Sequence, residues 1–289
     1  MTKAILHIGL HKTGTTSFQN ACFANRESLI ERGILYPTES TLTLGTTQHQ
    51  GLVASLRFGE RDDIARRIQK LAEISLEYEA LLLSSEDFSY LFGADDCENA
   101  GEVTHATLKA AFAEVRYVCV VREDREILRS TLREMIESTG MPYDGTGFVK
   151  REVGKFYGRS KRIARTLKGH LKVLRYEDLA CRGLISGLLY EATGVDIPVS
   201  DTIVHSTLGK DARELLLSNM RMLFFNAERS ATPYTEKINA RYRDVYGAVT
   251  INPEINRQIE DIFADWLNRE MEAALSENVT LLSDILDRA

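Results

Sequence analysis

The residues with the clearest chemical potential form the loop GLHKTGTT at positions 9–16. This loop follows the short apolar run at residues 4–8 and precedes a stretch that reads as a helix. A glycine-rich turn between a strand and a helix presents backbone N–H groups and the positive end of the helix dipole to an anion. Folding alone does not explain two glycines, a lysine and three threonines in one such turn. The sequence therefore predicts a phosphate-binding loop.

The loop departs from the ATP-binding pattern G-x-x-x-x-G-K-[ST] at one place. Thr15 stands where that pattern has lysine, and the basic residue comes earlier, at Lys12. Thr16 stands where the Mg²⁺-binding hydroxyl would be. We therefore expect a loop that still holds phosphate but has altered cation chemistry.

The stretch HIGLHKTGTTSFQ at residues 7–19 resembles the 5′-phosphosulfate loop of sulfotransferases that use 3′-phosphoadenosine 5′-phosphosulfate (PAPS). The resemblance implies that Lys12 neutralises charge on the bridging oxygen as the sulfuryl group leaves. It further implies that PAPS, as co-substrate, is held through its 5′-phosphate by Thr13, Gly14, Thr15, Thr16 and Ser17.

A second motif lies at the end of the apolar run at residues 115–121. Arg122 and Ser130 reproduce the spacing of the family pattern R-N-P-x-D-x-x-x-S, although the Asn-Pro pair is absent. The resemblance implies that both residues bind the 3′-phosphate. An arginine at a strand end offers a two-pronged donor for such a group. Alternatively, Arg122 forms an ion pair with a nearby Glu or Asp, and Ser130 lies on a helix surface without a ligand.

A third motif, YEDL at residues 176–179, follows the run at residues 171–175. By resemblance, Tyr176 contacts the adenine base, although a strand-end aromatic that caps the sheet is equally compatible. The R-K-G segment with which cytosolic sulfotransferases bind the 3′-phosphate is absent, and residues 205–210 are a poor substitute for it.

An attacking hydroxyl needs a base within hydrogen-bond reach. Cytosolic sulfotransferases place a histidine just after the second core strand, where this sequence has Ser-Ser-Glu-Asp at residues 84–87. Glu86 is therefore the leading candidate, although the same four residues suit a helix cap. His49 is the second candidate, because its side chain titrates in a suitable range. Gln19 stands where heparan-type members have a catalytic glutamate. An amide cannot act as a base, but it can still contact the substrate.

The elements that must position these residues alternate between short apolar runs and helical stretches. Runs at residues 4–8, 80–84, 115–121 and 171–175 read as strands, with a short extended piece at residues 34–37. Helices are expected at residues 16–32, 64–75, 103–112 and 125–137. Another helix is expected to end at about residue 167, and a further one to begin at about residue 183. Alternation of this kind predicts a P-loop-like three-layer α/β fold with a central parallel sheet of four to five strands. We expect one domain over residues 1–289, with its core at 1–200 and a mostly helical C-terminal part at 201–289.

The overall composition of the chain limits the kinds of molecule that it is expected to bind. A net charge of −6 argues against a nucleic-acid-binding surface, no run is long enough for a membrane span, and a cytoplasmic location is expected. The four cysteines form no Cys-x-x-Cys pair, which favours reduced thiols. No metal-ligand spacing occurs, so no metal is expected.

The expected function is transfer of a sulfuryl group from PAPS to a hydroxyl or amine of a glycan, a lipid or a small molecule. A P-loop kinase using Mg-ATP and a non-catalytic nucleotide-binding protein remain as alternatives. The sequence leaves the acceptor and the oligomeric state open.

Overall fold

The computed structural model describes residues 2–10, 13–38, 49–94, 97–122, 127, 158–181, 183–197 and 199. The chain divides into two compact units, and the described residues other than Ile127 belong to the first of them. Lys12, Ser130 and the predicted helical part from residue 201 lie outside the described residues.

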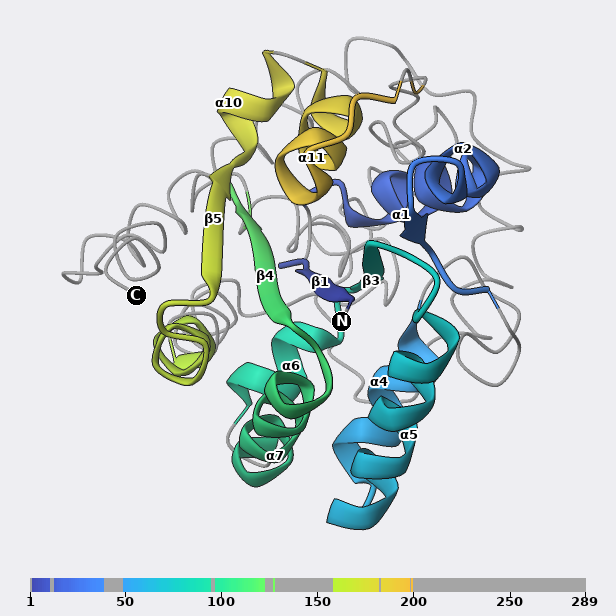
Figure 1. Ribbon diagram of the computed structural model, residues 1–289. Helices are drawn as coiled ribbons and strands as arrows, with labels where there is room; N and C mark the ends of the chain where they lie inside the picture. Colours follow the sequence, from blue (N-terminus) through green and yellow to red (C-terminus); the bar gives the residue numbers. More distant parts are fainter. Residues whose placement is uncertain are drawn as a thin grey trace, which may run out of the picture. The chain divides into compact units, whose positions relative to one another are not determined.

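The centre of this unit is a parallel sheet of five strands in the order β2-β3-β1-β4-β5 (Figure 1). The strands are β1 (Lys3–Ile8), β2 (Ile34–Leu35), β3 (Ala80–Ser85), β4 (Glu114–Val121) and β5 (Leu171–Arg175). Central β1 lies between β3 and β4, so that Leu6 is paired with both Leu83 and Tyr117. The four apolar runs and the extended piece are confirmed as strands, and so is the parallel α/β sheet.

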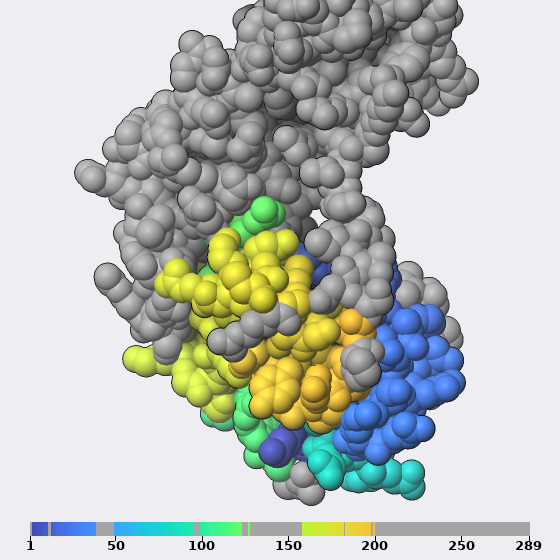
Figure 2. Space-filling model, turned by 90° about the horizontal axis from the view of Figure 1, so that it is seen from above, coloured from blue at the N-terminus to red at the C-terminus, as the bar shows by residue number. Residues whose placement is uncertain are grey.

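Helices cover both faces of the sheet (Figure 1). One layer holds α1 (Thr15–Ala24), α2 (Arg26–Ile30) and α11 (Leu184–Thr193). The other holds α4 (Gln50–Phe58), α5 (Arg61–Ile74), α6 (Phe88–Gly93) and α7 (Glu98–Ala111). The short α10 (Tyr176–Ala180) follows β5 directly. Figure 2 shows the first layer from above, where α10 and α11, yellow to orange, lie beside blue residues of the α1–α2 segment.

Strand alternation divides the core between the two layers. Ile5, Leu82 and Val118 pack in one cluster with Phe18 of α1 and Leu188 of α11. On the opposite face, the fully buried Tyr117 packs edge-on against Phe92 of α6 and bonds His105 of α7 at 2.8 Å. Both faces of the sheet are therefore covered, which is why its strands read as near-continuous apolar runs.

The helix predicted over residues 16–32 is wrong in its length, because Asn25 divides it into α1 and α2. The Asn25 side-chain amide donates to the Ala21 carbonyl at 2.9 Å, and the residue itself leaves helical geometry. Asparagine side chains compete in this way with the backbone for hydrogen bonds. The helix predicted at residues 103–112 begins earlier, at Glu98.

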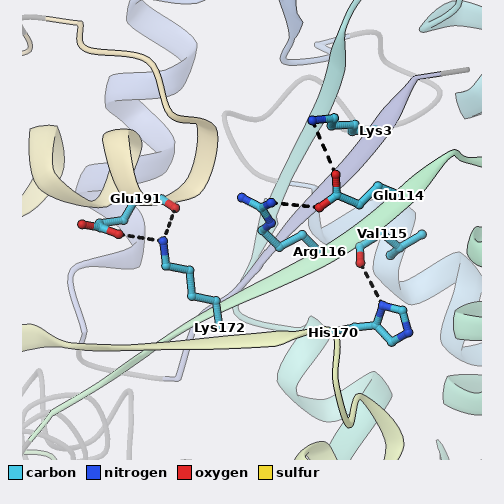
Figure 3. A network of polar contacts seen from close by, with 7 residues as sticks. All are labelled: Lys3, Glu114, Val115, Arg116, His170, Lys172 and Glu191. Atoms are coloured by element: carbon cyan, nitrogen blue, oxygen red, sulfur yellow. Dashed lines mark hydrogen bonds and ion pairs between the residues drawn. The ribbon is translucent and has the colours of Figure 1, made fainter.

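A network of polar contacts joins β1, β4, β5 and α11 (Figure 3). The Glu114 carboxylate lies 2.8 Å from Arg116 Nη2 and 3.5 Å from Lys3 Nζ. The hydrogen bond from Arg116 is the largest of the contacts that lower the pKa of Glu114. Lys172 reaches the Glu191 carboxylate at 2.7 Å. These charges are half exposed, so each ion pair contributes little to stability.

Cys22, Cys97 and Cys119 are buried free thiols, and Cys181 is an exposed one. Within the described ranges, no helix is long and apolar enough to cross a membrane.

Candidate functional site

The loop after β1 lies where the order of the strands reverses. From β1 the chain passes to β2 and β3 on one side of the sheet and later to β4 and β5 on the other. In open parallel sheets, ligands bind outside the carboxyl ends of the strands at such a switch point. Strands β3, β4 and β5 are parallel to β1 and end at this same edge. The predicted motifs follow these strand ends.

Gly14 fixes the geometry of the loop as it enters α1. It has φ 82° and ψ 14°, and a Cβ at this position would lie only 2.7 Å from Leu184 Cδ2. The first helical bond runs from the Phe18 N–H to the Gly14 carbonyl at 3.1 Å. The N–H groups of Thr15 and Thr16, which begin the first turn, therefore have no acceptor within the helix. Glycine offers them no side-chain cap and the first turn has no acidic residue, so this end of α1 suits an anion.

Two threonines of the loop make their described contacts inside it. The Thr13 hydroxyl donates to the Leu10 carbonyl at 2.7 Å and lies 3.4 Å from the Thr15 hydroxyl. Both residues are buried, and Thr15 packs against Gly9 so closely that a Cβ there would collide with it. These contacts shape the loop, while Gly14 and Thr16 are partly exposed. The predicted phosphate contacts of the threonines and of Ser17 stay predictions.

Arg122 and Tyr176 lie against each other at the ends of neighbouring strands. The register pairs Val121 with Arg175, which brings the next residue of each strand to the same edge. The Arg122 guanidinium carbon lies 4.7 Å from the centre of the Tyr176 ring, in cation–π contact. A Cβ on Gly14 would lie 3.9 Å from Tyr176 Cε2. The fold thus brings together three predicted binding residues from three separate motifs.

Glu86 follows β3, on the other side of β1. It is half-buried. Burial lowers the pKa of His7, and the Glu86 carboxylate opposes this shift in part. The helix cap that this segment could supply is not formed, because α6 begins after Asp87 without a side-chain cap; the Ser85 hydroxyl accepts the Asp87 N–H at 3.2 Å. Glu86 therefore stays the leading candidate for the base.

His49 is fully buried and held by the main chain. Its Nε2–H donates to the Pro37 carbonyl at 2.9 Å, and its Nδ1 accepts the Ser84 N–H at 3.0 Å. Burial lowers the pKa of His49, against the opposing effect of its backbone bonds. With both nitrogens occupied, the side chain ties α4 to β3 and the segment after β2. We carry Glu86 forward as the base in preference to His49.

Two further polar side chains, His7 and Gln19, lie buried between β1 and α1. From the sequence, Gln19 was expected at most to contact the substrate, and His7 was expected to belong to the core. The His7 Nδ1 bonds the Ser84 hydroxyl at 2.8 Å, and the ring packs edge-on against Phe18. Within the described part of the chain, His7 Nε2 and both amide atoms of Gln19 are buried without a hydrogen-bond partner. The sequence could have pointed to these two residues through their position, because both are polar residues at core-facing positions of the first strand and the first helix.

Acid should weaken the fold through His7. Burial lowers the His7 pKa to about 4, so in the folded state the ring stays neutral where the unfolded chain takes up a proton. The neutral His7 ring therefore contributes to the free energy of unfolding. Its contribution is complete above about pH 6.5 and falls by about 3 kcal/mol as the pH falls toward 4. We expect the difference in unfolding free energy between the wild type and His7→Asn to shrink over this range, measured by urea titration. A difference that does not change with pH would contradict this assignment.

No three His, Cys, Asp or Glu side chains gather as a metal site in the part of the chain that the structure describes.

The sequence matches no protein-family model and no curated protein. Its structure is similar to that of a sulfotransferase from Alicyclobacillus acidocaldarius, at 13% identity and a TM-score of 0.42, over 77% of this chain and 96% of that one. It is also similar to a sulfotransferase domain from the curacin biosynthetic pathway, at 13% identity and a TM-score of 0.38, over 84% and 98% of the two chains.

Proposed function

We propose that this protein is a sulfotransferase that moves the sulfuryl group of PAPS to a hydroxyl or amine of a glycan, a lipid or a small molecule. The observation that carries this proposal is the meeting of Gly14, Arg122 and Tyr176 at the switch point of the sheet. Each of these residues belongs to a different motif, and each motif was identified for the same nucleotide.

The chemistry of this cluster suits a 3′-phosphorylated adenosine. The amino terminus of α1, opened by Gly14, offers backbone N–H groups to the 5′-phosphate. Arg122 offers a planar, permanently charged donor pair to a second phosphate, and Tyr176 offers an aromatic face to the base. Since Arg122 and Tyr176 are in contact, the second phosphate and the base would be held side by side.

Sulfuryl transfer requires little beyond positioning and neutralisation of charge. The acceptor oxygen or nitrogen forms a bond to sulfur while the bond from sulfur to the bridging phosphate oxygen breaks. The bridging oxygen keeps the electron pair, and Lys12 is proposed to neutralise its charge. The acceptor's proton passes to the Glu86 carboxylate and from there to solvent. The products are adenosine 3′,5′-bisphosphate and a sulfate ester, or a sulfamate where the acceptor is an amine.

The loop is poorly arranged for a kinase. An ATP-binding P-loop needs a lysine at position 15 that reaches the β- and γ-phosphates. Thr15 is instead buried, with its hydroxyl packed against Gly9 and near Thr13. A side chain at this position faces the inside of the loop.

Calorimetry with two nucleotides tests the proposal. Adenosine 3′,5′-bisphosphate should bind tightly without metal, and ATP with Mg²⁺ should bind weakly by comparison. A preference for Mg-ATP would refute the proposal in favour of a kinase. Bisphosphate binding without turnover of labelled PAPS on a broad acceptor panel would favour a non-catalytic nucleotide-binding protein.

A further inference from the structure

The first residue of α11 packs directly against the phosphate loop. A Cβ built on Gly14 would lie 2.7 Å from Leu184 Cδ2, too close for two carbon atoms, whose best separation is about 3.5–4.0 Å. The Leu184 side chain therefore fills the space that a side chain on Gly14 would need. Leu184 is only 6% exposed and belongs to the core cluster that also contains Phe18 of α1. On this side, Gly14 is thus in contact with the core of the protein.

The conformation of Gly14 makes the loop a receptor for anions. Its φ of 82° and ψ of 14° are left-handed, and Thr15 begins the right-handed helix α1. A left-handed residue next to a right-handed one turns successive backbone N–H groups toward a common point, which forms an anion-binding concavity. Glycine adopts negative φ about as readily as positive φ, so the residue type alone does not hold this conformation. A neighbour in the tertiary structure must do so.

The segment that carries α10 and α11 supplies this neighbour. The three atoms nearest to a Cβ on Gly14 belong to Leu184 and Tyr176, at the starts of α11 and α10. α11 lies beside α1 (Figure 1), and Leu188, one turn after Leu184, packs in the same cluster as Phe18. The helix is therefore anchored on α1 by residues other than Leu184, which leaves Leu184 to act on the loop.

We propose that Leu184 is a positioning residue for nucleotide binding. It holds Gly14 in the left-handed conformation and so keeps the N–H groups of the loop directed at the 5′-phosphate. This role rests on the proposed function, because it concerns the nucleotide of that same site. An apolar side chain offers the nucleotide no hydrogen bond, so Leu184 acts through Gly14. Without it, Gly14 adopts other conformations for part of the time, and only the remaining fraction of molecules is competent to bind.

Replacing Leu184 with alanine removes the contact and keeps the glycine. Adenosine 3′,5′-bisphosphate should then bind roughly three- to tenfold more weakly in calorimetry of the full chain, because apparent affinity falls in proportion to the competent fraction. In turnover of labelled PAPS, the KM for PAPS should rise by a similar factor while kcat changes little. Leu184→Met restores most of the side-chain volume and should recover the wild-type affinity.

Leu188→Ala is the matched control. Leu188 is equally a buried leucine of α11 in the same cluster, so its truncation should destabilise the fold to a similar degree. Its bisphosphate affinity should nevertheless stay unchanged once the folded fraction, measured by circular dichroism, is taken into account. Equal losses of affinity in Leu184→Ala and Leu188→Ala would overturn the specific role of Leu184. If Leu184→Ala does not fold, Leu184→Val is the milder truncation and should weaken binding in the same direction by a smaller factor.

Nuclear magnetic resonance of the nucleotide-free protein separates this role from the nucleotide assignment. The backbone ¹⁵N of Gly14 should show a lower order parameter or new exchange broadening in Leu184→Ala, but not in Leu188→Ala. A Gly14 signal that is unchanged in Leu184→Ala would refute the positioning role, even in a chain that binds bisphosphate. A wild-type chain that does not bind bisphosphate would refute the proposed function and the nucleotide role together, whatever the Gly14 signal shows.

Discussion

Replacing Arg122 with alanine should weaken the binding of adenosine 3′,5′-bisphosphate by at least about 100-fold, because each of its two hydrogen bonds to a charged group contributes about 1.5–3 kcal/mol. Arg122 is proposed to hold the 3′-phosphate with two parallel N–H groups, and its stacking on Tyr176 fixes the plane of the fork. The loss should therefore appear as a rise in the dissociation constant, measured by calorimetry without metal.

Arg116→Ala is the matched control for this experiment. Arg116 lies on the same strand, β4, and pairs with Glu114 at 2.8 Å. Its removal should leave bisphosphate affinity unchanged and cost little stability. Arg122→Lys separates charge from geometry, since lysine keeps the charge and loses both the fork and the planar stack. Equal losses in Arg122→Ala and Arg116→Ala would show that net charge, and not a specific phosphate contact, supports binding.

Replacing Glu86 with glutamine should lower kcat by about 100- to 10,000-fold, the usual contribution of a positioned general base. Glutamine keeps the size of the side chain and loses its ability to take the acceptor's proton. Bisphosphate affinity should stay unchanged, because Glu86 follows β3 while the proposed nucleotide contacts follow β1, β4 and β5. The rate is measured with an acceptor identified by screening with labelled PAPS.

Glu79→Gln controls for the loss of one negative charge. Glu79 is an exposed residue at the opposite end of β3, where its N–H donates to the Gly33 carbonyl at 2.8 Å. It should leave kcat unchanged. A Glu86→Gln variant with undiminished kcat would rule Glu86 out as the base.

The strands of this protein could be predicted from its sequence, because each is a short apolar run buried on both faces. Residues 80–84 and 115–121 predict their strands to within about one residue of the observed bounds. The break at Asn25 could not be predicted from helical periodicity, since the periodicity of apolar residues does not register a side chain that competes for a backbone carbonyl.

The candidate site divides in the same way. The identity of the loop depends on residue types and spacing along the chain, so Gly14, Arg122 and Tyr176 could each be named from local patterns. Only the tertiary structure decided that they meet, because that depends on the strand order and on the register that pairs Val121 with Arg175.

The structure also distinguished two side chains that the sequence left as alternatives. His49 and Glu86 both carry groups that can take a proton, and the sequence says nothing of their surroundings. Burial against the Pro37 carbonyl and the Ser84 N–H occupies both nitrogens of His49, whereas Glu86 is partly exposed at the edge where the loops open. By itself the sequence determined the residue types and the spacing from which the loop at residues 9–16 is predicted to bind phosphate. Tertiary packing decided which side chains face it, because burial and hydrogen-bond partners arise only when distant segments come together.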